Sequence, residues 1–331
     1  QIPIRRAPSL IDLISLIYFI YFRLIIRPDL SLSFSPKGGF LNALTFFLPG
    51  KTVHYFTGQR WVTFKGIKRY FYILIDKFII KTSKAVYCDS FSQAEFLAKT
   101  LNIKSPKVIN HGSISGVDTN LFIPKVREKI FTKKDFQEEQ KFLKFKSFLN
   151  KTQSKKHISI FGYIGRLNAD KGIITLLEAF KEHLNIFPSN KLVLIGPIEI
   201  NKKYLEIVYK NTESFLLLDY TNYIYFYYPH FNSIILPSLR EGFGSVVIEA
   251  GACKIPCIST KVPGPIDFII HKKNGYFIKK NSKSDLLNAI NYFANNNSEV
   301  KRFGENAYKL VKKKYERRNV EKKFYKEFNL L

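Results

Sequence analysis

Acidic residues are scarce in this chain of 331 residues, which has 26 Asp and Glu against 53 Lys and Arg and a formal net charge of +27. Three interpretations of the basic excess stay open. It reflects a biased composition rich in Lys, Asn and Ile, or attraction to anionic lipid or nucleic acid, or binding of phosphorylated substrates. Apolar residues make up 46% of the chain, which excludes a disordered protein.

Cysteine and methionine are also rare. The three cysteines, Cys88, Cys253 and Cys257, form neither a CxxC redox motif nor half of a zinc site, so a disulfide framework and a zinc finger are excluded. Small buried thiols in a reducing compartment are the better interpretation. The chain has no Met and begins at Gln1. We therefore expect a piece of a longer product, or one whose start has been removed.

A long uncharged apolar run is missing too. The best candidate, residues 10–30, is interrupted by Asp12 and Arg23 and stopped by Pro28, and the uncharged stretch between the two charges is too short to span a membrane. No small-residue cleavage site follows, which argues against a signal peptide. The run predicts a helix packed on a sheet, with a helix lying in the plane of a membrane surface as the second interpretation.

Strand and helix patterns alternate along the first half. This alternation predicts a parallel sheet covered by helices. Helices are expected over residues 10–28, 61–83 and 92–101, the last with Ser92 as N-cap and Glu95 three residues on. Strands are expected over residues 30–34, 51–56, 85–90 and 107–112.

A highly charged stretch, residues 124–156, predicts a domain boundary with an exposed helix. It would separate a first domain, residues 1–123, from a second, residues 157–309, followed by a C-terminal helix over 310–331 that returns to the first domain. The alternation restarts with a helix over 172–184 and strands over 157–165, 191–196, 232–238, 255–260 and 275–278. Two doubly wound α/β domains are expected, with a ligand in the cleft between them.

The stretch "PSLREGFGSVVIEAGACKIPCIST", residues 237–260, contains two glutamates with seven residues between them, Glu241 on a loop and Glu249 inside a predicted helix. The loop glycines allow close backbone approach, and free N–H groups at a helix start suit a diphosphate. Glu249 can then grip a ribose diol while Glu241 reaches hydroxyls of a second group. The alternative is a solvated loop glutamate and an ordinary helix glutamate.

A second stretch, "GYIGRLNADKGI" (residues 162–173), also follows a strand and opens a helix. Arg166 offers a planar fork to phosphate oxygens, and Lys171 offers a mobile point charge. Together they can neutralise a leaving diphosphate without a metal. No Asp-x-Asp occurs in the chain, so a metal-chelating nucleotide site of that kind is not expected. The alternative interpretation is surface charge near a turn.

These two stretches, with "VPGPIDFI", resemble family 4 of the retaining, nucleotide-sugar-dependent glycosyltransferases, which have the GT-B fold of two Rossmann-like domains. In the first half, "SPKGG", "HYFTGQRW", "CDSFSQAEF" and "HGSISGVDTNLF" are similar to the capsule and O-antigen branch of that family. The resemblance covers most of the chain. It implies sugar transfer from a nucleotide-sugar, with UDP-sugars favoured, to a lipid-linked acceptor such as a polyprenyl-diphosphate saccharide.

The resemblance also implies site residues. Arg166 and Lys171 would hold the donor diphosphate, Glu241 would contact the transferred sugar, and Glu249 would bind the ribose. The remaining donor-side positions are Gly165, Gly242, Phe243, Gly244, Ser245 and Gly264, with Asp267 beside Gly264. On the acceptor side the resemblance indicates Lys37, His54, Thr57 and Gly58, where Thr57 replaces the family's usual His. No cofactor and no metal are implied.

Family members begin with a strand, a Gly-rich loop and a helix ahead of the "RPD" segment. This chain contains "RPD" and starts after those three elements. We therefore expect a first sheet that lacks its opening strand, and activity that depends on the preceding segment. The basic, aromatic helix over residues 61–83 is suited to bind anionic lipid at the inner face of the cytoplasmic membrane. The alternative is a helix packed on its sheet with Lys outside.

Three other functions remain open. A nucleic-acid-binding protein is supported by the charge, although no nucleic-acid-binding motif occurs. A nucleotide-sugar epimerase would share the fold, but the Arg166/Lys171 and Glu241/Glu249 pattern favours transfer. An inactive remnant would fit the missing opening segment.

Overall fold

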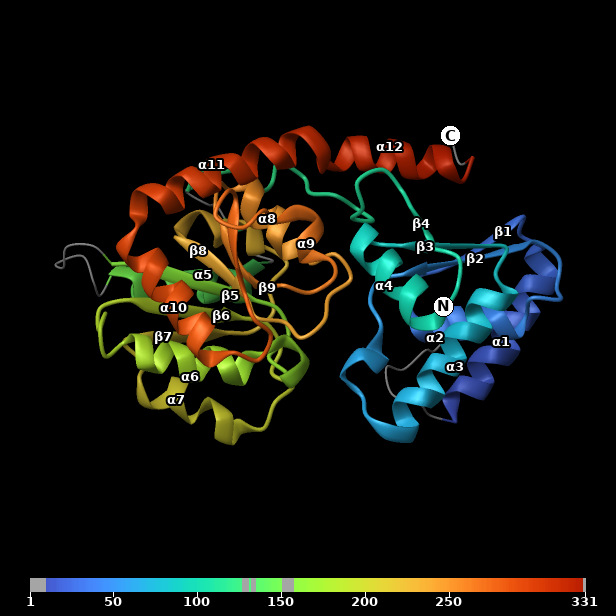
Figure 1. Cartoon of the computed structure of the whole chain (residues 1–331), viewed down its shortest axis with the longest axis horizontal. Coiled ribbons are helices and arrows are strands. Elements are labelled where there is room, and N and C mark those ends of the chain that lie inside the picture. Colours follow the sequence, from blue (N-terminus) through green and yellow to red (C-terminus); the bar gives the residue numbers. More distant parts are fainter. Residues whose placement is uncertain (1–9, 127–130, 132–134, 151–157, 330–331) are drawn as a thin grey trace. The chain divides into compact units, whose positions relative to one another are not determined.

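The computed structural model describes residues 10–126, 131, 135–150 and 158–329. The chain forms two compact units, Gln1–Gly112 and Ser113–Leu331, which Figure 1 shows in sequence colours. We call them the first and the second unit. The sequence placed the boundary segment at residues 124–156, whereas the contacts divide the chain at Gly112.

The first unit is a four-stranded parallel sheet covered by helices. Its strands run in the order β1 (Leu30–Ser33), β2 (Lys51–Phe56), β3 (Ala85–Cys88) and β4 (Lys107–Val108). Its helices are α1 (Ile11–Ile26), α2 (Pro36–Leu44), α3 (Gly66–Thr82) and α4 (Phe91–Leu101). The four strands predicted from the sequence are all present, so the parallel sheet expected from the alternation is confirmed.

Local capping corrects two predictions in this unit. The N-cap of α4 is Ser90, whose hydroxyl accepts from the Gln93 N–H at 3.3 Å, and Ser92 lies inside the helix. The helix expected over residues 61–83 is divided into a 3-10 turn, Arg60–Thr63, and α3. Helix α2 was not predicted from the sequence. Its N-cap is Ser35, whose hydroxyl accepts from the Gly38 N–H at 3.0 Å, and Pro36 lies in its first turn.

Helix α1 carries its charged residues inward and its apolar residues outward. Arg23 is buried and donates to the carbonyl oxygens of Thr45 at 2.8 Å and Pro49 at 2.7 Å. Asp12 pairs with Lys37 of α2. Large apolar side chains along the rest of the helix are exposed, among them Leu13, Ile17, Tyr21 and Ile25. Among the described residues no helix is both long and apolar enough to cross a membrane.

The second unit is a six-stranded parallel sheet in the order β10-β9-β8-β5-β6-β7. The strands are β5 (Ile160–Ile164), β6 (Lys191–Ile195), β7 (Phe215–Leu218), β8 (Ser233–Leu236), β9 (Cys257–Thr260) and β10 (Gly275–Ile278). The order reverses between β5 and β8, as in a doubly wound fold. Strand β7 was missed, because a four-residue apolar run is ambiguous between strand and helix.

Two apolar cores lie on the two faces of this sheet, because neighbouring strand residues point to opposite sides. Leu192 and Leu194 of β6 belong to one core, and Val193 and Ile195 to the other. The helices are α5 (Phe136–Asn150), α6 (Ile173–His183), α7 (Glu206–Lys210), α8 (Ser245–Ala252), α9 (Pro265–Phe268), α10 (Lys283–Asn295), α11 (Asn297–Lys314) and α12 (Arg317–Glu327). Figure 1 shows α6, α7 and α10 on one side of the sheet and α8 and α11 on the other.

Helix α5 overturns the expectation of an exposed helix in the charged stretch. It buries Phe142, Phe145 and Phe148 in the core of the second unit. The three phenylalanines recur every third residue and form a stripe that the surrounding charges obscure in the sequence.

The segment after Gly112 joins the second unit. The Val117 N–H donates to the Tyr315 carbonyl at 2.8 Å, and the Arg317 N–H donates to the Val117 carbonyl at 2.9 Å. The C-terminal segment expected to start at residue 310 begins inside the continuous helix α11. Its return to the first domain stays a prediction.

Candidate active site

The reversal of strand order in the second unit brings two loops together. Strands β5 and β8 are direct neighbours, with Phe161 opposite Ser233 and Gly162 opposite Ile234. Their helices leave on opposite faces of the sheet, so the carboxyl ends of the two strands open a crevice where ligands of such folds bind. The loops that border it, residues 165–172 and 237–244, lie within the two stretches whose motifs predicted the donor site, residues 162–173 and 237–260.

Two ion pairs join these loops. The Lys171 Nζ lies 2.5 Å from Oε1 of Glu241, and the Arg240 Nη2 lies 2.7 Å from Oδ2 of Asp170. The Leu239 N–H also donates to the Asp170 carbonyl at 2.8 Å. The Lys171 side chain is 20% exposed and that of Glu241 is 9% exposed, so solvent screens their attraction only partly. Residues 70 positions apart thus form one charged site at the switch of strand order.

Arg166 lies on the same loop but has a different partner. Its Nη1 is 2.8 Å from Oε2 of Glu199, which also accepts from the Asn168 Nδ2 at 2.9 Å. Glu199 follows β6 and was missed by the sequence analysis. The signal was present, because a Gly-Pro pair directly after the apolar strand "KLVLI" marks a further loop at this edge of the sheet.

Glycines let the loops approach through their backbones. Gly196 has φ +144°, and a Cβ there would lie 2.2 Å from the Gly165 carbonyl oxygen. Gly264 has φ +99°, and a Cβ there would lie 2.6 Å from the Gly242 carbonyl oxygen. Any side chain at either position would overlap the neighbouring loop.

The helix expected to begin near Ser245 begins at that residue. Gly244, with φ +83°, precedes α8, and no side chain caps its first turn. The N–H groups of this turn and the dipole of the helix favour an anion at this end. Phe243 is buried and packs on Tyr315 with ring centroids 5.3 Å apart. The Phe243 side chain is therefore part of the core, and only its backbone faces the loop.

Glu249 lies one turn into α8 and accepts from the Tyr228 hydroxyl at 2.6 Å through Oε2. Burial raises the pKa of Glu249, while the Tyr228 hydrogen bond and the charge of Arg317 act in the opposite direction. Burial also raises the pKa of Tyr228 far above its ordinary value, so Tyr228 stays a neutral donor. Tyr228 was not identified from the sequence.

A pocket of about 460 Å³ lies beside the charged site, at the carboxyl ends of β5 and β6. Its wall includes Gly165, Arg166, Gly196, Pro197, Tyr220 and Ile224. The volume lies within the roughly 300–1,000 Å³ of ligand sites that enclose a small molecule. Among the described residues no group of three or more His, Cys, Asp or Glu is arranged to hold a metal ion. Independence of metal and cofactor stays a prediction.

The acceptor-side candidates lie in the first unit. Lys37 follows β1 in the first turn of α2, while Thr57 and Gly58 follow β2, so the parallel register brings all three to one edge of the sheet. The Thr57 hydroxyl donates to the Phe34 carbonyl at 3.3 Å. His54 lies in the interior, 1% exposed, with its Nδ1 2.8 Å from the Ser33 Oγ. Burial lowers the pKa of His54 to about 4, so it is neutral at pH 7 and offers no exposed surface to a substrate.

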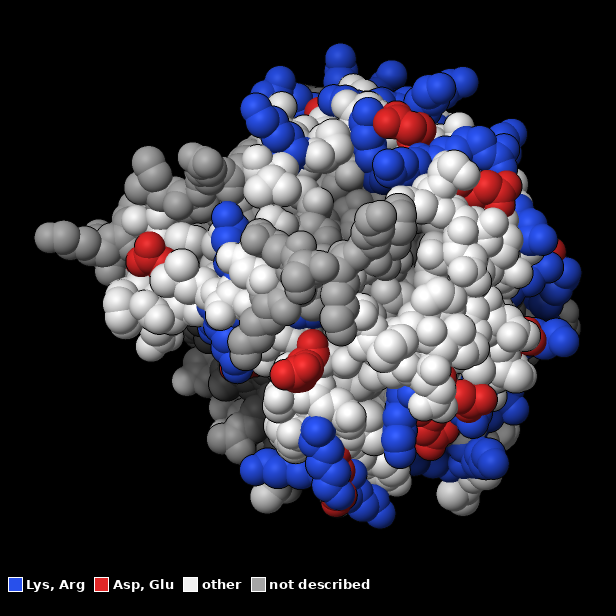
Figure 2. Space-filling model, turned by 90° about the vertical axis from the view of Figure 1, so that its left-hand side faces the viewer, with Lys and Arg blue, Asp and Glu red and all other residues white. Residues whose placement is uncertain are grey.

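Surface charge bears on the nucleic-acid alternative. On the face drawn in Figure 2, Lys and Arg of the described residues lie mostly along the margins. Nucleic-acid-binding proteins often carry a continuous basic stripe across a binding face, and this alternative stays open.

Comparison with known proteins identifies the family of the chain. Residues 144–310, half of the chain, match the family described as glycosyl transferases group 1. The capsular polysaccharide biosynthesis glycosyltransferase CapM of Staphylococcus aureus is 27% identical over 327 residues, covering 95% of this chain and 80% of CapM. An Escherichia coli UDP-Gal:α-D-GlcNAc-diphosphoundecaprenol α-1,3-galactosyltransferase is 26% identical over 274 residues, 79% of this chain and 65% of that protein.

Solved structures show the same fold. Sucrose-phosphate synthase from Thermosynechococcus elongatus superposes with a TM-score of 0.78 at 18% identity, over 99% of this chain and 81% of that chain. Anabaena HepE in complex with UDP gives a TM-score of 0.72 at 17% identity, over 98% and 85%. The α/β architecture of two Rossmann-like units and the family expected from the loop motifs are both confirmed. This chain belongs to the glycosyl transferases group 1, and it is a glycosyltransferase.

Proposed function

We propose that the protein transfers a sugar from a UDP-sugar to a lipid-linked saccharide, with retention of configuration, in the biosynthesis of a cell-surface polysaccharide. The names of two relatives support this proposal, the capsule glycosyltransferase CapM and the galactosyltransferase that acts on a diphosphoundecaprenol-linked sugar. The reaction would take place in the cytoplasm at the inner face of the membrane, where basic side chains of the first unit favour anionic lipid.

The ion pair of Lys171 and Glu241 across the switch of strand order is the observation that carries the proposal. Breaking a sugar–phosphate bond builds negative charge on the diphosphate. Lys171, Arg166 and the N–H groups at the start of α8 stabilise that charge as the bond lengthens. As Lys171 turns to the phosphate, Glu241 is released to accept hydroxyls of the transferred sugar.

Glu249 binds the ribose of the donor in this proposal. Tyr228 occupies one of its carboxylate oxygens, which fixes the side chain and leaves the other oxygen for the diol. The pocket beside Gly165 and Gly196 takes the nucleobase. We name no enzyme nucleophile. The leaving phosphate oxygen accepts the proton of the incoming hydroxyl on the same face of the sugar.

Calorimetric titration of the chain with UDP and GDP tests the donor site. We expect micromolar binding of UDP that is lost in Glu249→Gln, a variant that keeps the size of the side chain and an acceptor for Tyr228. Glu206→Gln is the matched control, because Glu206 lies on the surface of α7, where it pairs with Lys210. Absence of nucleotide binding by a folded chain would contradict the proposal. A salt-sensitive, sequence-independent affinity for DNA that exceeds nucleotide affinity would favour the nucleic-acid alternative.

A further inference from the structure

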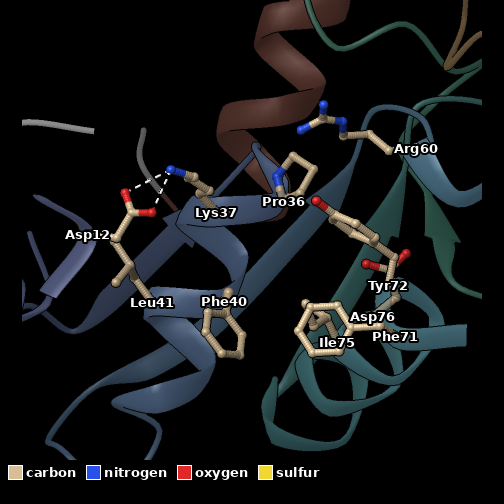
Figure 3. Close-up of a pocket in the computed structure, with 10 residues that line it drawn as sticks. All are labelled: Asp12, Pro36, Lys37, Phe40, Leu41, Arg60, Phe71, Tyr72, Ile75 and Asp76. Carbon is tan, nitrogen blue, oxygen red and sulfur yellow. Dashed lines mark hydrogen bonds and ion pairs between the residues drawn. The ribbon is translucent and has the colours of Figure 1, made fainter. Parts of the chain in front are cut away.

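The first unit contains a pocket that the donor site does not use. It has a volume of about 250 Å³ and lies between α2 and α3, next to the loops that follow β1 and β2. Ligands of open parallel sheets bind beyond the carboxyl ends of the strands, and this pocket lies at that edge of the first sheet. Figure 3 shows the side chains that line it.

One end of the pocket is apolar. Phe40 comes from α2, while Phe71 and Ile75 come from α3 and face it. Phe71 is 58% exposed and Phe40 is 36% exposed, so two aromatic rings stand in contact with water. Covering them with hydrocarbon would be favourable, because burial of apolar surface is the main driving force of association.

The other end carries positive charge. Arg60 and Lys37 lie at the same end of the pocket in Figure 3, on either side of Pro36. Lys37 is bonded to both carboxylate oxygens of Asp12 at 2.7 Å, which offsets its charge. The Arg60 guanidinium makes no hydrogen bond or ion pair with the described residues. Its planar fork is therefore available to a phosphate group.

The two ends are held in a fixed relation. The Trp61 Nε1 donates to Oδ2 of Asp76 at 2.7 Å, and both side chains are buried. This bond ties the turn that carries Arg60 to α3, which carries Phe71 and Ile75. The cationic end and the apolar wall are thus preorganised before any ligand binds.

A ligand that matches both ends is an amphiphile with a phosphate and a hydrocarbon chain. We propose that this pocket binds the lipid phosphate of the acceptor, with Arg60 at the phosphate and the first part of the chain against Phe40, Phe71 and Ile75. The volume lies just below the roughly 300–1,000 Å³ of sites that enclose a whole small molecule, so it holds a segment of the chain and not the whole lipid. This inference rests on the proposed function and identifies where its acceptor lipid binds.

The test is calorimetric titration of the full chain with farnesyl diphosphate, farnesol and inorganic diphosphate, without donor. Farnesyl diphosphate should bind at least about tenfold more tightly than either half alone, because both ends are engaged. Trp61 is the only tryptophan in the chain, and its fluorescence should change with occupancy, since its indole bonds a wall residue.

Two variants with matched controls locate the binding. Phe71→Ala should weaken the binding of farnesyl diphosphate roughly tenfold. Tyr70 lies on the same helix and is 62% exposed, and Tyr70→Ala should have no effect on this binding. Arg60→Ala should weaken the binding of farnesyl diphosphate but leave the binding of farnesol unchanged. Lys77→Ala, which removes an exposed lysine of α3, should change the binding of neither ligand. Equal effects of each variant and its control would overturn the proposal.

Bulk membrane lipid is the competing source of a phosphate on a chain. Sedimentation with anionic phosphatidylglycerol vesicles distinguishes binding of bulk membrane lipid from binding of the acceptor lipid. If Phe71→Ala abolished vesicle binding while farnesyl diphosphate bound equally to both proteins, the pocket would be a membrane contact and the proposal would be wrong. Failure of the proposed function is distinguished by UDP binding, which is measured on the second unit and is independent of these variants.

Discussion

Both sheets are parallel, but the side chains at their carboxyl edges have different chemistry. In the second unit this edge is built from loops that glycines bring together and that two ion pairs join, Lys171–Glu241 and Arg240–Asp170. In the first unit it is an aromatic pocket with Arg60 and Lys37 at one end. One edge suits a polar anion with many hydroxyls, and the other suits a chain with a phosphate. The parallel sheet fixes where a ligand binds, and the loop residues decide which ligand.

Loss of the Lys171 ammonium should have the largest effect on sugar transfer. The effect should be confined to the donor site of the second unit. In Lys171→Ala the leaving diphosphate loses a preorganised cation, so we expect kcat of sugar transfer to fall by roughly 10²–10³. Binding of farnesyl diphosphate to the first unit should be unchanged. Lys210→Ala, which removes a surface lysine of the same unit, should keep full activity. Normal transfer by Lys171→Ala would refute its assignment to the diphosphate.

Two glycine variants compare the packing of the two units. Gly172 has φ +68°, and a Cβ there would lie 2.1 Å from the Pro237 carbonyl oxygen. Gly66 has φ +56° with nothing within 4 Å. We expect Gly172→Ala to lower the free energy of unfolding of the second unit by about 2–4 kcal/mol and Gly66→Ala to lower that of the first by about 1 kcal/mol.

Chemical denaturation measures both glycine effects in one protein. Trp61 reports only the first unit, and circular dichroism reports both. Equal losses in the two variants would show that the backbone contact between the loops of the donor site is not a constraint.

The first unit should also respond to pH through a buried carboxyl. Burial raises the pKa of Asp76 to about 7, despite the Trp61 hydrogen bond that lowers it. A carboxyl with a raised pKa in the folded state contributes stability that is full below its unfolded pKa and is lost as pH rises through about 7. Between pH 4 and 7.5 the wild type should therefore lose roughly 1–3 kcal/mol of stability relative to Asp76→Asn.

His54 acts in the opposite direction in the same window. Its pKa is lowered to about 4, so its contribution is present above its ordinary pKa and is lost as pH falls through 4. The difference between wild type and Asp76→Asn cancels this contribution, because His54 is common to both. Tryptophan fluorescence followed during denaturation at each pH gives the difference. A constant difference across the window would show that Asp76 does not titrate there.

The smallest effect is expected at the donor site of the second unit, where UDP binding depends on a single hydrogen bond from Tyr228 to Glu249. In Tyr228→Phe, Glu249 loses the bond that lowers its pKa, so a larger fraction of it is protonated at any given pH and UDP should bind roughly 3- to 10-fold more weakly. The loss should shrink at pH 8 relative to pH 6, because the carboxylate form returns. Calorimetry at the two pH values measures it, with Tyr55→Phe in the first unit as control. A loss that grows with pH would contradict a ribose-binding carboxylate.

Much of the second unit could be predicted from the sequence. The loops 165–172 and 237–244 and the start of α8 at Ser245 were placed correctly, because glycines and a following amphipathic helix are local signals. The stripe of Phe142, Phe145 and Phe148 was overlooked among charges, and β7 was too short to recognise. Ser90 was missed as a cap because Ser92 offers an equally good local pattern.

The sequence by itself determined the residue types at both loops of the donor site and the parallel α/β class, since turn chemistry and apolar periodicity are properties of short segments. Only the tertiary structure decided which side chains meet. It paired Lys171 with Glu241 and Arg166 with Glu199, it placed Tyr228 on Glu249, and it sent His54 into the core. These outcomes depend on strand order and on burial, which join residues that are far apart in the chain and which no local pattern encodes.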